Sequence, residues 1–332
     1  MEMERNSRTF QPCLCLAVFL IVLSFSSLAD VRGEEYPSRP VKIVIPYAPG
    51  GVSSVIWRSI AEPMGKALGQ PVVIENKPGG GTTVAWTYLA GSKPDGYTTG
   101  GAPVSTLTNS FLAYKVNYHP VKSFVHIGGI WQYNQVFVVK SDSRWKTWKE
   151  FFDYVKNHPN EVKVGHTNPT AIGPSTMKWI AKKNVLDWKD VHFNSEAECI
   201  TALLGDHIDG FVGSGVVHTL LRDGRAMAIL AITQNRIPGY PDVPTVFELY
   251  KKKSFNTAGM IAPAGVPEPI VRKLETALHE GTKSPEYKKT IEKMGAFVYW
   301  RNSKEFLEDV TDTLETQEDV LRTIGLLKKE KK

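Results

Sequence analysis

The chain has 332 residues, of which 42% are hydrophobic and 22% are charged, the composition of an ordinary soluble protein with room for two domains. Its formal net charge is +6, but the basic residues are mixed with acidic ones, which argues against nucleic acid as a partner. The one dense basic run, residues 328–332, is typical of a solvated tail. After residue 33, no stretch is long and apolar enough to cross a bilayer.

Residues 1–33 are predicted to be a secretory signal peptide. A polar segment with basic residues precedes an apolar stretch, residues 13–28, and small residues near Ala29 and Gly33 suit cleavage. The alternative is an uncleaved anchor, and the apolar stretch is short for a spanning helix. After cleavage Cys199 is the only cysteine left, so no internal disulfide can form.

The mature chain opens with a strand, a glycine-rich turn and a helix. Residues 41–45 are an apolar β-branched run, which predicts a buried strand, and glycines 50–51 follow in a turn. Ser53 and Ser54 are suitable caps for a helix over residues 55–68. This geometry directs free backbone N–H groups and the positive end of a helix dipole at one point, so its natural guest is an anion.

A second unit of the same kind follows. Residues 71–75 predict a strand, residues 76–81 form another glycine-rich turn, and Thr82 and Thr83 can cap a helix over residues 84–90. Two strand–turn–helix units in a row indicate a parallel α/β sheet.

The rest of the chain continues this alternation. Strands are predicted over residues 97–101, 124–139, 162–165, 191–193, 208–212, 226–233, 257–262 and 296–300. Helices are predicted over residues 146–157, 175–183, 196–204, 216–222, 267–280, 285–294 and 303–326. Ser105 and Thr106 are placed in a loop. The long segment 124–139 suits a strand that leaves one domain and enters another, and residues 257–262 suit the return crossing.

Seven segments along the mature chain carry a resemblance to a known family. They are YPSRPVKIVIPYAPGG (36–51), NKPGGG (76–81), KPDGYT (93–98), YHPVKSF (118–124), LLGDHIDG (203–210), DVPTVFEL (242–249) and APAGVPEPIVRKLE (262–275). In this order they resemble the periplasmic solute-binding proteins of tripartite tricarboxylate transporters, the Bug or TctC family. Each segment is weak evidence alone, and the set together is specific.

The resemblance implies an α/β fold of the periplasmic-binding-protein type (type II-like), with two α/β domains, a central ligand cleft and two crossover strands. Domain 1 would comprise residues 36–133 and 258–332, and domain 2 residues 134–257. The family implies a periplasmic receptor that is not an enzyme and has no cofactor or metal, and we expect a monomer. Its ligand would be a small carboxylic acid, either a di- or tricarboxylate or an aromatic acid, delivered to membrane permease subunits.

In this family the ligand is held mostly by backbone groups, small polar side chains and bridging waters. The matching positions in the first part of the chain are Tyr47, Gly50, Gly51, Val52, Ser53, Ser54, Gly81, Thr82, Thr83, Ser105 and Thr106. The matching positions in the second part are His166, Thr167, Asn168, Thr170, Ser175, Asn194, Ser195 and Ser214.

The chain departs from the family pattern at Ser54 and Gly213, where members commonly carry an acidic or amide residue. Because both partners for a ligand ammonium group are missing, the sequence leads to the hypothesis of a plain carboxylic acid instead of an amino acid. Trp57, Trp86 and Trp131 are predicted near the cleft, where they could stack on an aromatic acid; core packing is the favoured alternative.

Other functions fit the motifs less well. Neither glycine turn is followed by the Gly-Lys-Ser/Thr of a phosphate-binding loop, and the histidines lack metal-ligand spacing. A serine hydrolase using Ser53 or Ser54 stays open as an alternative, although Ser53 and Ser214 lack the GxSxG context of a nucleophile elbow. A second alternative keeps the fold and makes the protein a ligand-sensing co-receptor for a membrane signalling kinase.

Overall fold

The computed structural model describes residues 35–50, 52–167, 169–193, 195–237, 239–253 and 256–328. The predicted signal peptide and three predicted site residues, Gly51, Asn168 and Asn194, lie outside these ranges. Residues 39–332 form one compact unit, which contains every helix and strand named below.

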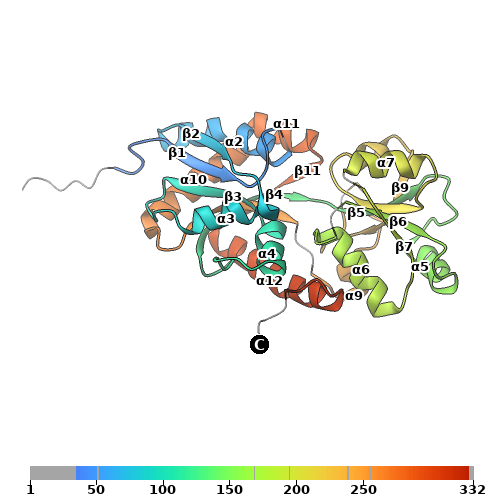
Figure 1. Cartoon of the computed structure of the whole chain (residues 1–332). Helices are drawn as coiled ribbons and strands as arrows, with labels where there is room; N and C mark the ends of the chain where they lie inside the picture. Colours follow the sequence, from blue (N-terminus) through green and yellow to red (C-terminus); the bar gives the residue numbers. More distant parts are fainter. Residues whose placement is uncertain are drawn as a thin grey trace, which may run out of the picture. The chain divides into compact units, whose positions relative to one another are not determined.

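The first of two mixed β-sheets has the strand order β11-β4-β10-β3-β1-β2 (Figure 1). Its strands are β1 (Val41–Ile45), β2 (Val72–Asn76), β3 (Thr98–Pro103), β4 (Phe124–Tyr133), β10 (Thr257–Pro263) and β11 (Ala296–Arg301). Strand β1 pairs in parallel with β2 and β3, as the two opening units predict, whereas β10 is antiparallel to β3 and β4. The parallel strands therefore end at one edge, where the glycine-rich turns follow β1 and β2.

The second sheet has the strand order β7-β6-β8-β5-β9. Its strands are β5 (Val136–Lys140), β6 (Lys163–His166), β7 (Lys189–His192), β8 (Gly210–Gly213) and β9 (Ala226–Ala231). The segment predicted as one β-rich run over residues 124–139 is divided at Asn134 and Gln135 into β4 and β5, which belong to different sheets. The chain thus crosses from the first sheet to the second here, and it returns with β10.

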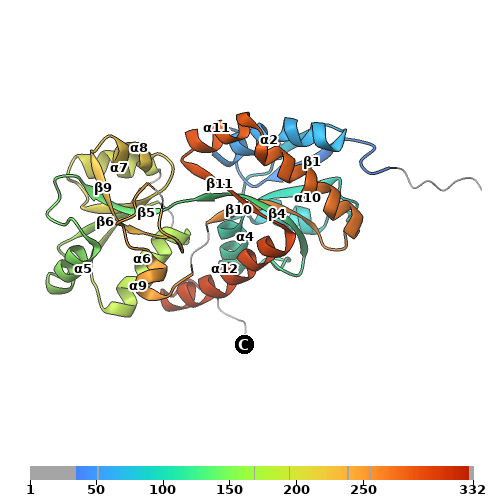
Figure 2. The same ribbon diagram turned by 180° about the vertical axis from the view of Figure 1, so that it is seen from behind.

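Helices pack against the sheets in groups (Figures 1 and 2). With the first sheet lie α2 (Val52–Leu68), α3 (Thr83–Ala90), α4 (Val104–Ala113), α10 (Glu268–Lys283), α11 (Pro285–Lys293) and α12 (Ser303–Thr323). With the second lie α5 (Trp148–Asn157), α6 (Ile172–Asn184), α7 (Glu196–Leu204), α8 (Val217–Arg222) and α9 (Val246–Tyr250). Among the described residues, no helix has both the length and the apolar character that a membrane span requires.

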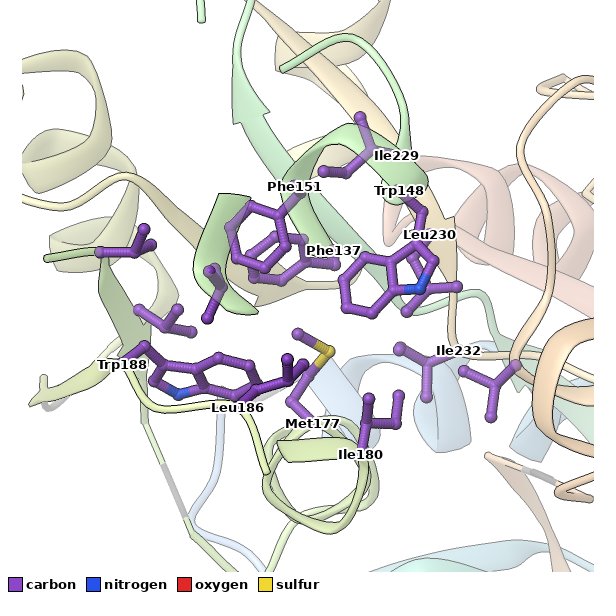
Figure 3. Close-up of a cluster of buried hydrophobic side chains, with 14 of the residues drawn as sticks. Phe137, Trp148, Phe151, Met177, Ile180, Leu186, Trp188, Ile229, Leu230 and Ile232 are labelled. Carbon is purple, nitrogen blue, oxygen red and sulfur yellow. The ribbon is translucent and has the colours of Figure 1, made fainter. Parts of the chain in front are cut away.

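Each sheet has its own hydrophobic core. Aromatic residues fill much of the core of the second sheet, where Phe137 packs against Trp148 and Phe151, with ring centroids 6.0 and 4.9 Å away (Figure 3). Cys199, a free cysteine that is 1% exposed, packs among apolar residues beside the same sheet. The prediction that Cys199 is a small buried hydrophobic residue is therefore confirmed.

The structure corrects two predicted helix starts and one predicted loop. Helix α2 begins at Val52, so Ser53 and Ser54 lie inside the helix and do not cap it. Helix α4 begins at Val104, which places Ser105 and Thr106 in a helix and not in a loop. Helix α6 begins at Ile172, and Ser175 lies in its first turn, where its Oγ donates to the carbonyl oxygen of Ile172. A hydroxyl that bonds to its own helix in this way fits the helix interior as well as a cap.

Asp309 on α12 is a buried carboxyl group in the first sheet's core. It is 1% exposed, its Oδ1 lies 3.2 Å from Nη2 of Arg301, and its Oδ2 has no hydrogen-bond partner in the structure. Burial raises the pKa of Asp309 to about 6; Arg301 opposes this rise, and the negative charges of Asp312 and Glu305 add to it. The native state therefore holds this proton more tightly than the unfolded chain does.

Replacing Asp309 by Asn is expected to flatten the pH dependence of stability between pH 3.8 and about 6. In this window the native state binds more protons than the unfolded state, so the free energy of unfolding falls as the pH rises. Above this window the charged Asp309 lowers the free energy of unfolding by its full amount, on the order of 3 kcal/mol. Urea denaturation across the window measures the slope, with exposed Glu315→Gln on the same helix as control. An unchanged slope in D309N would contradict the assignment.

Candidate functional site

A cavity of ≈ 720 Å³ lies where the first turns of several helices meet the loops that follow the strands. Its described lining is Pro46, Tyr47, Ala48, Val52, Ser53, Pro78, Gly79, Gly81, Thr82, Pro103, Ser105, Thr106, Asn109, Ser110, Tyr114, Tyr133, Gln135, Thr170, Ala171, Ile172, Ser214 and Asn256. No Asp, Glu, Lys, Arg or His is among these residues. The described walls of the cavity therefore carry no fixed full charge.

Four helices begin at this cavity. Val52 and Ser53 open α2, Thr82 precedes α3, Ser105 lies in the first turn of α4, and Ile172 opens α6, and all of them line the cavity. None of the four helices has an acidic residue in its first turn, and α3, α4 and α6 lack a side-chain cap. The first N–H groups of a helix have no partner within the helix, so these four ends attract negative charge.

Helices that begin away from the cavity are different. A side chain at the N-cap accepts a first-turn N–H in α5 (Thr147), α7 (Ser195), α9 (Thr245), α11 (Ser284) and α12 (Asn302). Each of these five also has an acidic residue in its first turn, as does α10, which begins with Glu268. Among the described helices of eight or more residues, the N-terminal positive charge is thus left uncompensated only at the cavity.

Hydroxyl groups add further donors to the cavity wall. The Oγ of Ser53 is buried, with the residue 7% exposed, and has no hydrogen-bond partner in the structure. Ser110 Oγ donates to the carbonyl oxygen of Gly81 and lies 3.0 Å from Oγ1 of Thr82, which fixes the second glycine turn against α4. The Ser53 hydroxyl therefore has a proton available to a ligand.

Two tyrosines on the cavity wall stay neutral. Burial raises the pKa of Tyr47, and a hydrogen bond with Thr106 opposes the rise only in part. Burial is also the largest cause that raises the pKa of Tyr133, and the neighbouring Tyr47 adds to the rise. Neutral phenols can donate hydrogen bonds to an anion, so neither group repels a carboxylate.

Contacts between elements of the two sheets hold the cavity walls in place. The Nδ2 of Asn109 on α4 donates to the carbonyl oxygen of Thr170, just before α6. Farther away, Oδ2 of Asp319 on α12 accepts hydrogen bonds from Nε1 of Trp179 and from Nζ of Lys252, both at 2.9 Å. Helix α12 therefore contacts α6 as well as the first sheet.

The structure brings nine of the predicted site residues to this cavity. They are Tyr47, Val52, Ser53, Gly81, Thr82, Ser105, Thr106, Thr170 and Ser214. Seven other predicted residues do not line it, namely Gly50, Ser54, Thr83, His166, Thr167, Ser175 and Ser195. A role of either group in ligand binding stays a prediction.

Most of the residues outside the cavity have a structural partner. Ser54 is fully buried and its Oγ is 3.3 Å from Nδ2 of Asn76. Thr83 Oγ1 donates to the carbonyl oxygen of Gly80, and Ser195 caps α7. His166 is 8% exposed at the end of β6. Burial is the largest cause that lowers the pKa of His166. It is therefore neutral at pH 7.

Several lining residues were not predicted. Asn109, Ser110 and Tyr114 line the cavity from α4 and the residue after it. Asn109 and Ser110 follow Ser105 and Thr106 at the i,i+4 spacing that places side chains on one helix face. Recognition of that helix would have predicted them. Tyr133, Gln135 and Asn256 come from the two crossings between the sheets, and no local motif marks them.

The three tryptophans predicted near the cleft are core residues. Trp57, Trp86 and Trp131 are each fully buried, and none lines the cavity. Trp57 and Trp131 pack edge to face with centroids 5.5 Å apart. The favoured alternative, core packing, is therefore the arrangement that the structure shows.

Comparisons with known proteins agree with this picture. Residues 56–326 match the model of a family described as the tripartite tricarboxylate transporter family receptor. The chain is 28% identical over 301 residues to the UPF0065 protein in the gbd 5' region of Cupriavidus necator, covering 90% of this chain and 92% of that protein.

Two solved structures are also similar. MatC from Rhodopseudomonas palustris with bound malate is 29% identical, with a TM-score of 0.69, and the match covers 86% of this chain and 100% of MatC. A TctC solute-binding protein from Polaromonas without ligand has a TM-score of 0.77 at 23% identity, covering 86% of this chain and 99% of that one. The second likeness concerns the fold alone.

Proposed function

Since the chain belongs to the tripartite tricarboxylate transporter family of receptors, we propose that its cavity captures a small carboxylate and that the protein delivers this ligand to the membrane permease subunits of such a transporter. The protein is a solute-binding receptor of the periplasmic-binding-protein fold and not an enzyme. Consistent with this, the described lining of the cavity contains no histidine that could act as the base for Ser53.

The convergence of four helix starts without a first-turn acid, three of them without a side-chain cap, on a cavity whose described lining is uncharged carries the proposal. Backbone N–H groups and the Ser53 hydroxyl can donate to a carboxylate, while the helix dipoles compensate its charge. An interaction of this kind needs no arginine or lysine, and without a fixed counter-charge the ligand can be released to a second protein. The cavity volume of ≈ 720 Å³ lies in the range of small-molecule sites.

Further parts of the proposal follow from the family and the fold. We infer that residues 1–33 direct export and are removed, so that the mature receptor is a periplasmic monomer. Residues 36–133 with 258–332, and residues 134–257, would then be the two domains that close on the ligand. The separate sheets and the two crossings between them support this division. The malate bound to MatC supports a carboxylate as the ligand class.

A thermal-shift screen of the mature protein tests the binding proposal. Malate, succinate, citrate, aromatic acids and amino acids are added in turn, with the full methyl ester or amide of each acid as the control that lacks the carboxylate charge. A true ligand at a hundred times its dissociation constant should stabilise the protein by about 2.7 kcal/mol. Saturable stabilisation by an acid but not by its amide supports the proposal. No shift with any acid, confirmed by calorimetry, would refute it.

A further inference from the structure

Glu196 places a partly buried carboxylate beside the cavity. Its Oε1 accepts hydrogen bonds from the backbone N–H groups of Ser214 (3.1 Å) and Val217 (3.2 Å), and its Oε2 accepts one from the Ser214 hydroxyl (3.2 Å). Glu196 is the first residue of α7, and Val217 is the first residue of α8. The carboxylate of Glu196 therefore already occupies N–H groups at the start of α8, which a ligand carboxylate would otherwise use.

The Glu196 side chain lines a second cavity of ≈ 470 Å³. This cavity shares Val52, Tyr133 and Ser214 with the main cavity, so the two spaces meet at these residues. A ligand bound at the four helix starts can extend past Ser214 toward Glu196. Whether the far end of the ligand reaches Glu196 then depends on the length of the ligand.

The Glu196 carboxylate also lies close to the place that a side chain at position 213 would take. A Cβ atom added to Gly213 would lie 3.1 Å from Oε1 of Glu196. The hypothesis of a plain carboxylic acid rested on the absence of an acidic or amide residue at both Ser54 and Gly213, and near Gly213 the structure supplies a carboxylate from α7. The premise of the hypothesis therefore does not hold at this position.

No described Lys, Arg or His lies within ion-pair distance, 4.0 Å, of the Glu196 carboxylate. Burial raises the pKa of Glu196, and its three hydrogen bonds oppose the rise, whereas no cation contributes. His218 lines the same cavity, but burial lowers its pKa, and its Nε2 lies 2.8 Å from the carbonyl oxygen of Asn134.

Three charged side chains also line the second cavity. They are Arg222, Glu292 and Lys293. Arg222 donates to Oγ1 of Thr219 on its own helix, and the charges of the three residues sum to +1. Together with Glu196 the lining is neutral, and Glu196 hydrogen-bonds to Ser214, which lines both cavities.

We propose that the ligand is a carboxylic acid that also bears a cationic nitrogen, with its carboxylate at the uncapped helix starts and its ammonium group hydrogen-bonded to Glu196. This inference rests on the proposed carboxylate-binding function and specifies its ligand class. A dicarboxylate would instead bring a second negative charge toward Glu196, which like-charge repulsion disfavours. An ammonium group supplies the charge-assisted donor that Glu196 lacks.

Three matched pairs of ligands test this proposal. They are β-alanine with succinate, γ-aminobutyrate with glutarate, and δ-aminovalerate with adipate, and the members of each pair differ only by an ammonium group in place of a carboxylate. Isothermal titration calorimetry of the mature wild-type protein measures both members. At one chain length or more, the amino acid is expected to bind at least about tenfold more tightly, since a hydrogen bond to a charged group is worth that much or more.

The variant Glu196→Gln keeps the size of the side chain and removes its charge. We expect the preferred amino acid to lose at least about tenfold in affinity and the paired dicarboxylate to bind as well as before or better. Glu198→Gln is the matched control, because Glu198 lies in the same first turn of α7 and is exposed. Each variant removes one negative charge from the first turn of α7, so the effect of that loss on the helix is common to both.

The outcomes separate the two proposals. A preference for amino acids that Glu196→Gln abolishes and Glu198→Gln preserves supports the inference. A dicarboxylate preferred at every chain length overturns the inference and leaves the carboxylate receptor intact. Equal losses in both variants overturn the role of Glu196. If no acid of either class binds the wild type, the proposed function itself fails. The comparison of pairs on the wild type decides the ligand class even if Glu196→Gln does not fold.

Discussion

Replacing Ser105 by Asp is expected to reduce carboxylate binding at least about a hundredfold while leaving the fold intact. Ser105 lies in the first turn of α4 and lines the cavity. An aspartate there compensates the helix end and places a negative charge where the ligand carboxylate is expected. Two charges about 5 Å apart at an effective dielectric constant of about 20 repel each other by roughly 3 kcal/mol, which corresponds to more than a hundredfold.

Ser105→Asn is the control for this change, because asparagine has nearly the same size as aspartate without its charge. Calorimetry with whichever acid stabilises the wild type most should show S105N close to the wild type and S105D without measurable binding. The unliganded S105D protein should melt at the same temperature as the wild type or higher, since its charge favours the helix start. Equal affinities of S105D and S105N would show that the ligand charge lies elsewhere.

Replacing Gly215 by Ala is expected to weaken ligand binding by at least about tenfold and to lower stability as well. Gly215 lies between β8 and α8, and Met294 and Gly295 lie between α11 and β11. A Cβ atom on Gly215 would be 2.6 Å from the carbonyl oxygen of Met294, and one on Gly295 would be 2.3 Å from Cα of Gly215. Backbone atoms on both sides leave no flexible group to move aside, so the two turns must separate.

This separation reaches the ligand, because Ser214 next to Gly215 lines the cavity. An opened cavity contacts the ligand on one side only, and the apparent affinity falls in proportion to the population that can close. Gly239→Ala is the control, since a Cβ atom there meets nothing within 4 Å. Calorimetry and urea denaturation of both variants separate affinity from stability. Wild-type affinity in G215A would mean that the two turns are not coupled to the site.

Much of the fold was predictable because local patterns determine it. The apolar β-branched run at residues 41–45 is β1, and the apolar pattern at residues 196–204 is α7, with the same bounds. The TctC resemblance is confirmed by the family model over residues 56–326. Helix α9 was missed: its five residues are too short for a periodic pattern, although Thr245 and Glu248 form a capping box there.

The helix starts at the cavity were predicted less well, for a physical reason. The caps expected at Ser53, Ser54 and Ser175 are not made, and Thr82 precedes α3 at φ 81° without a side-chain hydrogen bond that caps the helix. A cap would satisfy the N–H groups that the site leaves open, so the rule for finding helix starts fails where these ends are exposed to the cavity. At α7, where Ser195 does cap the helix, the predicted start at Glu196 is correct.

By itself the sequence determined the alternation of strands and helices, the glycine turns after β1 and β2, and the family, because each depends on residues close together in the chain. Only the tertiary structure decided that Tyr133, Gln135 and Asn256 line the cavity and that Glu196 reaches the backbone of Ser214. Those residues lie on different elements, and their meeting depends on the order of the strands and on the two crossings between the sheets. No local propensity encodes that order, since it follows from how whole sheets bury their apolar faces.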